Sequence, residues 1–337
     1  MVPGNASYLQ CKEFHAVVTA TGISSRGLVM ATNSLPGTGV HKRQFLREWR
    51  KRETLAAWLF ILPALFGFVV FFAFPAVRGF YISLTDSDLL SEANYIGFEN
   101  YRDLAQDDNF RHSLWVTLYY VLLNIPLQTF LALVFALVFD RFIRGAGWRS
   151  ILLLPWLMPN VVVALLFLWL LDPGLGIVNE GLAAIGLPRM SFMGSVEQAM
   201  PSIAGINIWR HVGYTTLLVL AGMQRIPRDL YEAGALDGAS EFGMFKDITL
   251  PLLKPIMTFV LVTSIVGSFQ IYDTIAVTTQ GGPVKATRVI YWFIYEHAFE
   301  RYNFGYASAA SIVLFLILII ISLIQMRILR ANESDLS

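Results

Sequence analysis

Charged residues and cysteines are both scarce in this sequence. Only 15% of its 337 residues are charged, whereas 55% are hydrophobic. A soluble domain of this length needs roughly a quarter of its residues charged to hydrate its surface. The single cysteine, Cys11, cannot form an internal disulfide. The composition argues against a soluble globular protein or a disulfide scaffold, and it indicates a protein embedded in a lipid bilayer.

The motifs of common enzymes and metal sites are missing as well. The sequence contains no P-loop of glycines ending in Lys-Ser/Thr, no Gly-x-Ser-x-Gly turn and no His-Glu-x-x-His pair. No Cys/His cluster has the spacing of a metal site. A net charge of +1 provides no basic face for nucleic acid. We therefore expect no catalytic residues, no metal and no cofactor bound by this chain.

Long apolar runs make up most of the chain. A membrane-spanning helix needs about 20 apolar residues, and six runs of that order are present. They cover residues 55–77, 113–139, 150–171, 201–224, 255–279 and 302–326. Pro155 and Pro159 should kink the third run, whereas Arg210 and His211 make the fourth run less apolar. The pattern predicts an all-α membrane protein with six transmembrane helices.

Basic residues are distributed unequally between the two sides of these spans. Seventeen Lys and Arg residues lie before the first span, between the second and third, between the fourth and fifth, and after the sixth; seven lie in the other connections. Because basic residues concentrate on the cytoplasmic side, both termini should be cytoplasmic. The first external segment, residues 85–109, is acidic, and we interpret it as a solvated loop with a short amphipathic helix or as a docking surface.

The two ends of the chain differ in composition from the spans. Residues 1–40 have no periodicity and no signal-peptide pattern, which is typical of disorder; alternatively they are a spurious extension and translation begins at Met30 rather than Met1. Residues 41–54 form a basic cytoplasmic lead-in. We assign residues 55–330 to one six-helix domain and residues 331–337 to a cytoplasmic tail.

The cytoplasmic connection of residues 224–254 is long for a helical bundle. Pro227 can open a helix, and Gly238 can stop it in the left-handed conformation. A second short helix should begin near Ser240, with Phe242, Phe245 and Ile248 on one face, and end at Pro251. The connection therefore predicts a helix–glycine–helix elbow, a surface suited to a groove in another protein.

This elbow closely resembles the "EAA" loop of permease subunits of binding-protein-dependent ABC importers. The resemblance lies in Glu232-Ala233-Gly234, Asp237-Gly238-Ala239 and Ile248-x-Leu250-Pro251, with Gly234 in place of the usual third alanine. Further motifs resemble the maltose- and glycerol-phosphate-type branch, specifically the first of its two paired permeases. They are Leu171-Asp172-Pro173-x-x-Gly176-x-x-Asn179, Trp209-Arg210-x-x-Gly213-Tyr214, Gly281-Gly282-Pro283 with Thr287, Tyr295-Glu296 with Phe299, and Gly305-Tyr306-Ala307-Ser308-Ala309.

The resemblance implies a type I importer bundle whose elbow is a coupling helix. In this family the elbow docks on a cytoplasmic ATPase dimer, which hydrolyses ATP, while a second permease and an extracytoplasmic solute-binding protein complete the assembly in a prokaryotic inner membrane. The implied coupling positions are Glu232, Ala233, Gly234, Asp237 and Gly238. An alternative interpretation is that Glu232 only complements the helix dipole and Gly238 only caps the helix.

Polar groups inside spans are costly and usually face the bundle interior. Amides, carboxylates and aromatic rings bind carbohydrate, so a carbohydrate path is predicted along Asn124, Gln128, Trp209, Arg210, Tyr214, Gln270, Tyr272 and Asp273. Asn207 and His211 are further candidates. For Asn124 and Gln128, an ordinary hydrogen bond between helices is the alternative interpretation.

Two other functional classes compete with an importer subunit. An ion- or proton-coupled sugar carrier usually keeps acidic residues deep in its spans, and Asp273 is the one candidate here. A membrane-embedded enzyme would need paired carboxylates or a His cluster within one span, and none is found. The sequence leaves open whether the solute is an oligosaccharide, a polyol or a glycerol-phosphate-like compound.

Overall fold

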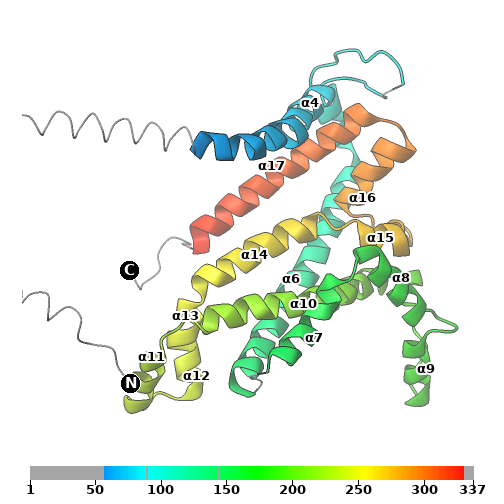
Figure 1. The fold of residues 1–337 in the computed structure, drawn as a ribbon. Helices are drawn as coiled ribbons and strands as arrows, with labels where there is room; N and C mark the ends of the chain where they lie inside the picture. The colour runs from blue at the N-terminus through cyan, green and yellow to red at the C-terminus, as the bar shows by residue number, and fades with distance from the viewer. Residues whose placement is uncertain (1–56, 89, 143–144, 330–337) are drawn as a thin grey trace, which may run out of the picture. The chain divides into compact units, whose positions relative to one another are not determined.

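A computed structural model describes residues 57–88, 90–142 and 145–329, and its elements are helical (Figure 1). The chain divides into two compact units, Met1–Pro75 and Ala76–Ser337. The cavity and the elbow considered in the next subsection both lie in the second unit. The predictions for residues 1–54 and 331–337, including the start at Met30, fall outside the described residues.

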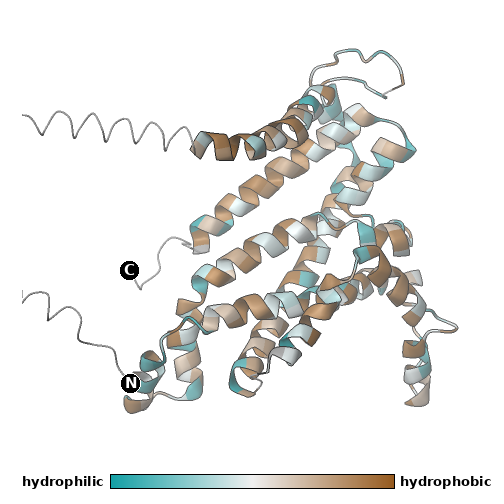
Figure 2. Ribbon diagram, viewed as in Figure 1, coloured by the Kyte–Doolittle hydropathy of each residue, from teal (hydrophilic) through white to brown (hydrophobic). Residues whose placement is uncertain are grey.

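Among the described residues, four helices are long and apolar enough to cross a bilayer, and Figure 2 shows their hydrophobic colouring. They are Ala57–Ile82, which contains η1 (Val69–Ala73) and α4 (Phe74–Ile82); Asp108–Phe142, which is α6; Lys254–Thr278, which joins α14 (Lys254–Phe269) to α15 (Asp273–Thr278); and Phe304–Ile328, in α17 (Phe304–Leu329). These helices correspond to the predicted first, second, fifth and sixth spans.

The predicted third span is broken sharply. Helix α7 (Ala146–Leu157) meets α8 (Asn160–Leu170) at 90°, so the pair is either one broken span or a re-entrant segment. Met158 and Pro159 both have extended ψ angles, 138° and 140°. At Met158 the cause is the proline ring that follows, which disfavours helical backbone in the residue before it. The kink predicted at Pro159 is confirmed, whereas Pro155 lies inside α7 near its end.

The predicted fourth span is α10 (Ala199–Met223), which has 25 residues. At 1.5 Å per residue it is roughly 37 Å long, enough to cross a bilayer. It does not reach the apolarity of the four helices above, and it carries Arg210 and His211 near its middle. The count of six spans therefore stays a prediction.

The core of the second unit forms where α6 packs against α10 and α14, and α14 against α17. Large side chains from these helices, from α15 and from α16 (Ile290–Tyr295) are fully buried, among them Tyr120, Ile203, Ile275 and Phe293. Shorter elements connect the spans. They are α5 (Glu99–Gln106), α9 (Ile177–Ala184), η2 (Phe192–Gly194) and η4 (Glu296–Glu300). The short helix expected within residues 85–109 is α5.

The elbow consists of α11 (Arg228–Leu236), α12 (Glu241–Met244), the π-helical turn η3 (Phe245–Thr249) and α13 (Leu250–Leu252). Figure 1 places it at one end of α10 and α14, with α8 and α15 at the other end. The helical stretch that begins at Glu241 ends at Leu252, one residue after the predicted end at Pro251. A second expectation was wrong. Phe242 and Ile248 do not share a face: the π-turn changes the angular spacing, so Phe242 is exposed and Ile248 packs inward.

Candidate functional site

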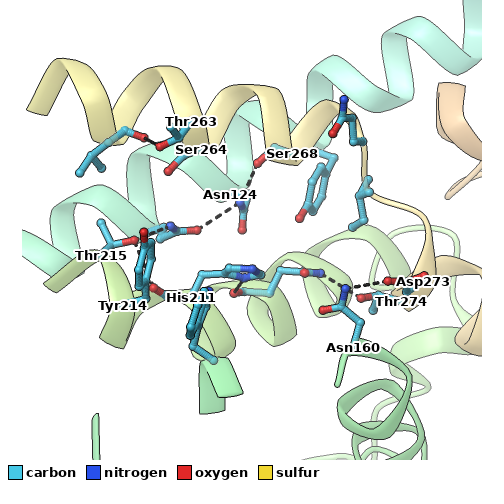
Figure 3. Close-up of a pocket in the computed structure, with 18 of the residues that line it drawn as sticks. Asn124, Asn160, His211, Tyr214, Thr215, Thr263, Ser264, Ser268, Asp273 and Thr274 are labelled. Atoms are coloured by element: carbon cyan, nitrogen blue, oxygen red, sulfur yellow. Dashed lines mark hydrogen bonds between the residues drawn. The ribbon is translucent and has the colours of Figure 1, made fainter. Parts of the chain in front are cut away.

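A cavity of about 260 Å³ lies between α6, α10 and α14, next to the start of α15 (Figure 3). Its lining is mostly neutral and polar, although apolar residues such as Leu218, Val260 and Ile271 also contribute. The side-chain amides come from Asn124, Gln128, Asn160, Asn207 and Gln270. The hydroxyls come from Tyr120, Tyr214, Thr215, Thr263, Ser264, Ser268, Tyr272 and Thr274. Trp156 adds an indole ring, His211 an imidazole and Asp273 a carboxylate.

Six of the predicted path residues line this cavity: Asn124, Gln128, Tyr214, Gln270, Tyr272 and Asp273. Trp209 and Arg210 do not, because α10 turns its Asn207–His211–Tyr214 face toward the cavity and residues 209 and 210 fall on other faces. The indole of Trp209 packs edge-on against Phe167 of α8, with ring centroids 5.1 Å apart.

Asn124 and Gln128 connect three helices through hydrogen bonds. The Asn124 amide donates to Ser268 Oγ on α14 at 3.1 Å, and the Gln128 amide donates to Thr215 Oγ1 on α10 at 2.9 Å. The alternative interpretation of these two residues, a bond between helices, is therefore what the structure shows. Both side chains nevertheless line the cavity, so the same groups that join the helices also form the cavity's polar wall.

Arg210 holds the broken end of α7. Its guanidinium donates to the carbonyl oxygen of Met158 from Nε at 3.2 Å and from Nη2 at 3.0 Å, and to that of Trp156 at 3.2 Å. The last carbonyl groups of a helix lack partners within the helix and carry partial negative charge, which a cation stabilises. Beside this contact the Trp156 ring stacks on Tyr214, with centroids 4.6 Å apart. Arg210 therefore positions the wall of the cavity without touching its interior.

Asn160, the first residue of α8, donates a 2.6 Å hydrogen bond to Asp273 Oδ2 at the start of α15. This bond joins the segment that follows the break to the last turns of the fifth span. Sequence reasoning did not select Asn160, although an amide directly after Pro159 in an apolar run was a usable signal. It also missed Thr215, Ser268 and Thr274, because small hydroxyl residues in spans look like ordinary packing residues.

The five predicted coupling positions lie on α11 and the turn that follows. Glu232, Ala233, Asp237 and Gly238 are exposed, and Gly234 is half-buried. A Cβ atom on Gly234 would lie 3.2 Å from Ile248 Cδ1, so the glycine relieves a tight contact with the inner side of the elbow. Gly238 has φ +80° and ends the helix as predicted.

Two further contacts hold the elbow in place. The hydroxyls of Tyr231 and Thr249 are 2.8 Å apart, which ties α11 to η3. The Ser240 hydroxyl caps α12 by accepting from the Gly243 N–H at 3.1 Å. The elbow is thus held together by its own hydrogen bonds, and its outer face is exposed to solvent in this chain.

The motifs around Asp172, Asn179 and Thr287 shape turns between the helices. Asp172 accepts hydrogen bonds from the backbone N–H groups of Leu175 and Gly174, which lower the pKa of its carboxyl group. Asn179 closes the following loop onto the backbone of Asp172 and Met190. Thr287 donates to the Gly282 carbonyl oxygen at 2.6 Å, consistent with a structural role for the Gly-Gly-Pro turn.

Comparison with known proteins gives consistent matches. Residues 128–334 match the family described as "binding-protein-dependent transport system inner membrane component". The trehalose/maltose transport system permease protein MalF of Thermococcus litoralis is 34% identical over 282 residues, which cover 82% of this chain and 94% of that protein. The sn-glycerol-3-phosphate transport system permease protein UgpA of Yersinia pseudotuberculosis is 32% identical over 273 residues, which cover 80% of this chain and 92% of that protein.

A solved structure matches as well. It is that of a bacterial ABC transporter involved in the import of the acidic polysaccharide alginate, with a TM-score of 0.74 and 25% identity, covering 86% of this chain and 100% of the other. A second structure of an alginate transporter, in complex with an alginate pentasaccharide-bound periplasmic protein, has a TM-score of 0.75 over 86% of this chain.

Proposed function

The chain belongs to the binding-protein-dependent transport system inner membrane components, and from this premise we propose that it forms one half of the pathway by which an ATP-driven importer moves a carbohydrate into the cell. It is a multi-pass membrane permease subunit and not an enzyme. The imported solute is an oligosaccharide, a polyol or a glycerol-phosphate-like compound. The names of its relatives include both uncharged and anionic solutes.

The polar cavity inside an apolar helical bundle is the observation that carries this proposal. Amides and hydroxyls are costly to place at membrane depth unless they line a path or join helices. Here they surround a volume of about 260 Å³ together with Trp156, Tyr214 and Tyr272. Planar amides and aromatic faces suit sugar hydroxyls and sugar rings. Among the described residues Asp273 is the one acid that lines the cavity, which favours an importer over a proton-coupled carrier.

The elbow is the proposed contact with the ATPase. Its exposed outer face carries Glu232, Ala233, Asp237 and Gly238, the residues that match the family's coupling motif. We place a cytoplasmic ATPase dimer on this face, a second permease beside the bundle and a solute-binding protein on the outer side. Both termini are then cytoplasmic, in agreement with the distribution of Lys and Arg.

Reconstituted uptake tests the proposal. The chain is co-purified with the proposed second permease and ATPase, placed in proteoliposomes and supplied with the proposed solute-binding protein. Carbohydrate uptake should require internal ATP and the binding protein, and it should ignore an imposed proton gradient. Uptake that follows the proton gradient without ATP would refute the importer and favour the carrier.

A matched pair of glycine variants tests the coupling role of the elbow. Gly238 and Gly186 both have left-handed backbone, φ +80° and +77°, and both face open space. Valine at either position is strained to a similar degree. Gly238→Val should leave the assembly intact but separate ATP hydrolysis from uptake, whereas Gly186→Val, outside the elbow, should retain coupling. If Gly238→Val kept ATP hydrolysis coupled to uptake, the proposed role of the elbow in coupling would be refuted.

A further inference from the structure

The cavity has an unusual charge balance for a site that would hold an anion. Of the described residues that line it, Asp273 is the one carboxylate and none is Lys or Arg. Asp273 makes no ion pair within 4.0 Å among these residues; its one hydrogen bond comes from the neutral amide of Asn160. Arg210 lies near the wall, but its guanidinium donates to carbonyl oxygens at the C-terminal end of α7 and to His211. The cavity lining itself therefore holds one carboxylate and no cation, although the Arg210 guanidinium behind the wall also interacts electrostatically with Asp273.

The imidazole of His211 adds no positive charge. Its Nε2 atom is 2.9 Å from Arg210 Nη1, and a guanidinium can only donate, so Nε2 must be an unprotonated acceptor. The hydrogen then sits on Nδ1, which lies 2.9 Å from the Asn207 carbonyl oxygen and donates to it. With Nε2 accepting, the ring is neutral.

A chain of hydrogen bonds determines the orientation of the two amides. The Thr215 hydroxyl donates to the His211 carbonyl oxygen at 3.1 Å, so the group 2.9 Å from its oxygen must be a donor, the Gln128 amide nitrogen. Gln128 Oε1 then faces Asn124 and accepts from the Asn124 amide nitrogen at 3.4 Å. In this series of hydrogen bonds Asn124 Oδ1 is the one amide oxygen that accepts none.

Asn124 Oδ1 has no hydrogen-bond partner among the described residues, although the Asn124 side chain is buried, with 3% of the residue exposed. Figure 3 shows this oxygen pointing into the middle of the cavity. A buried acceptor without a partner is costly and is normally satisfied by a ligand or by water. The second oxygen of Asp273 is also free to accept. Asn124 Oδ1 and the second Asp273 oxygen are therefore acceptors that require donors from a solute, beside the hydroxyl and amide groups of Tyr214, Tyr272 and Gln270 in the same lining.

We propose that the cavity selects an uncharged polyhydroxylated solute and excludes phosphorylated, sulfonated and carboxylated sugars. The inference rests on the proposed function and narrows its solute class. Sugar hydroxyls donate to Asn124 Oδ1 and to Asp273. An ionised phosphate, sulfonate or carboxylate offers acceptors only, and it brings a second negative charge near Asp273 in a site of low dielectric, where like charges repel strongly.

Direct binding to the assembled complex tests this inference. The complete transporter in nanodiscs is titrated with matched pairs, trehalose against trehalose 6-phosphate and glycerol against glycerol 3-phosphate, and contact is measured by saturation-transfer NMR without the binding protein. The neutral member of at least one pair should bind, with the anionic member at least about tenfold weaker, a ratio consistent with one repulsive charge at close range.

A gained charge provides the second measurement. Thr263 lines the cavity from α14 and its side chain reaches solvent. Thr263→Lys should reduce the preference for the neutral member by about tenfold or more, whereas Thr263→Met, of similar length and uncharged, should change both affinities alike. Binding of the anionic member as tightly as the neutral one in the unmodified complex would overturn this inference and leave the importer standing. Binding of neither member of any pair, together with no ATP-dependent carbohydrate uptake, would overturn both.

Discussion

At Gly213 α10 lies very close to α7, and this position supports a quantitative prediction. A Cβ atom at Gly213 would lie 1.8 Å from the Leu152 carbonyl oxygen and 2.8 Å from the Leu152 carbonyl carbon. An ordinary carbon–oxygen contact is about 3.3 Å or longer. Gly213→Ala therefore requires the two helix backbones to separate by roughly 1.5 Å, since a backbone oxygen cannot rotate away as a side chain can.

The separation would disturb contacts on both sides of Gly213. Arg210 would lose part of its charged hydrogen bonding to Met158, and the Trp156–Tyr214 stack would open. Overpacking of this kind costs about 1–3 kcal/mol and weakened charged hydrogen bonds about 1.5–3 kcal/mol, so we expect Gly213→Ala to destabilise the protein by roughly 2–5 kcal/mol.

The assay is thermal unfolding of the purified protein in detergent, followed by ATP-dependent uptake in proteoliposomes. Gly205→Ala is the matched control, because Gly205 lies on the same helix and a Cβ atom added there would meet no neighbouring side chain or helix within 4 Å; the higher helix propensity of alanine should make the change neutral or slightly stabilising. Equal melting temperatures for the two variants would refute the close approach of α7 and α10.

Three further predictions concern the outer side of the second unit. Gly305→Ala should lower the melting temperature by several degrees, because its Cβ would lie 2.0 Å from the Thr85 carbonyl oxygen. Glu296→Gln should cost about 3–5 kcal/mol of unfolding free energy, because it leaves the buried guanidinium of Arg288, 2.5 Å from Glu296, without its charge partner. Burial, reinforced by nearby guanidinium groups, lowers the pKa of His297 to about 4. The unfolded chain therefore binds more protons, and stability should fall as the pH drops from 6.5 to 4, by roughly 1–2 kcal/mol once solvent screening is allowed for.

Each of these predictions has an internal control. Gly181→Ala has open space around its Cβ and should leave the melting temperature almost unchanged. Glu180→Gln breaks the exposed pair with Arg189, which should cost at most about 1 kcal/mol. For the pH dependence, melting curves of His297→Gln should be flatter than those of the unmodified protein between pH 6.5 and pH 4. A slope that the variant retains would assign the effect to other groups.

The spans could be predicted from the sequence because a bilayer imposes a length and a composition on each helix. Five of the six runs correspond to apolar helices or to the bent pair, and the break follows from the backbone preference before Pro159. α10 is harder to recognise, since Asn207, Arg210 and His211 replace apolar residues where the helix faces the cavity and the end of α7. The polar residues that face the cavity and the end of α7 are the same residues that lower the hydropathy by which a span is recognised in the sequence.

The elbow shows where local chemistry is sufficient and where it is not. Capping at Ser240 and termination at Gly238 depend on one or two residues, so both were predictable. The inward turn of Ile248 depends on a π-helical turn, whose bonding pattern has no clear sequence signal. The residues predicted to couple lie on α11 and the turn after it, and their coupling role stays a prediction.

The cavity could be predicted only in part. Asn124 and Gln128 are four residues apart on one helix, so their shared face follows from helix geometry. Asn160 and Asp273 are 113 residues apart, and their contact depends on the 90° break and on the packing of α8 against α15. Trp209 and Arg210 were included in the path because their chemistry suits it, but the rotation of α10 about its axis directs them elsewhere.

The most direct test of the transport path is an electron cryomicroscopy structure of the assembled importer with a bound neutral sugar. We expect density for the sugar between α6, α10 and α14, with one hydroxyl within hydrogen-bonding distance of Asn124 Oδ1. A sugar bound elsewhere in the membrane region, with only water or lipid in this cavity, would contradict the assignment.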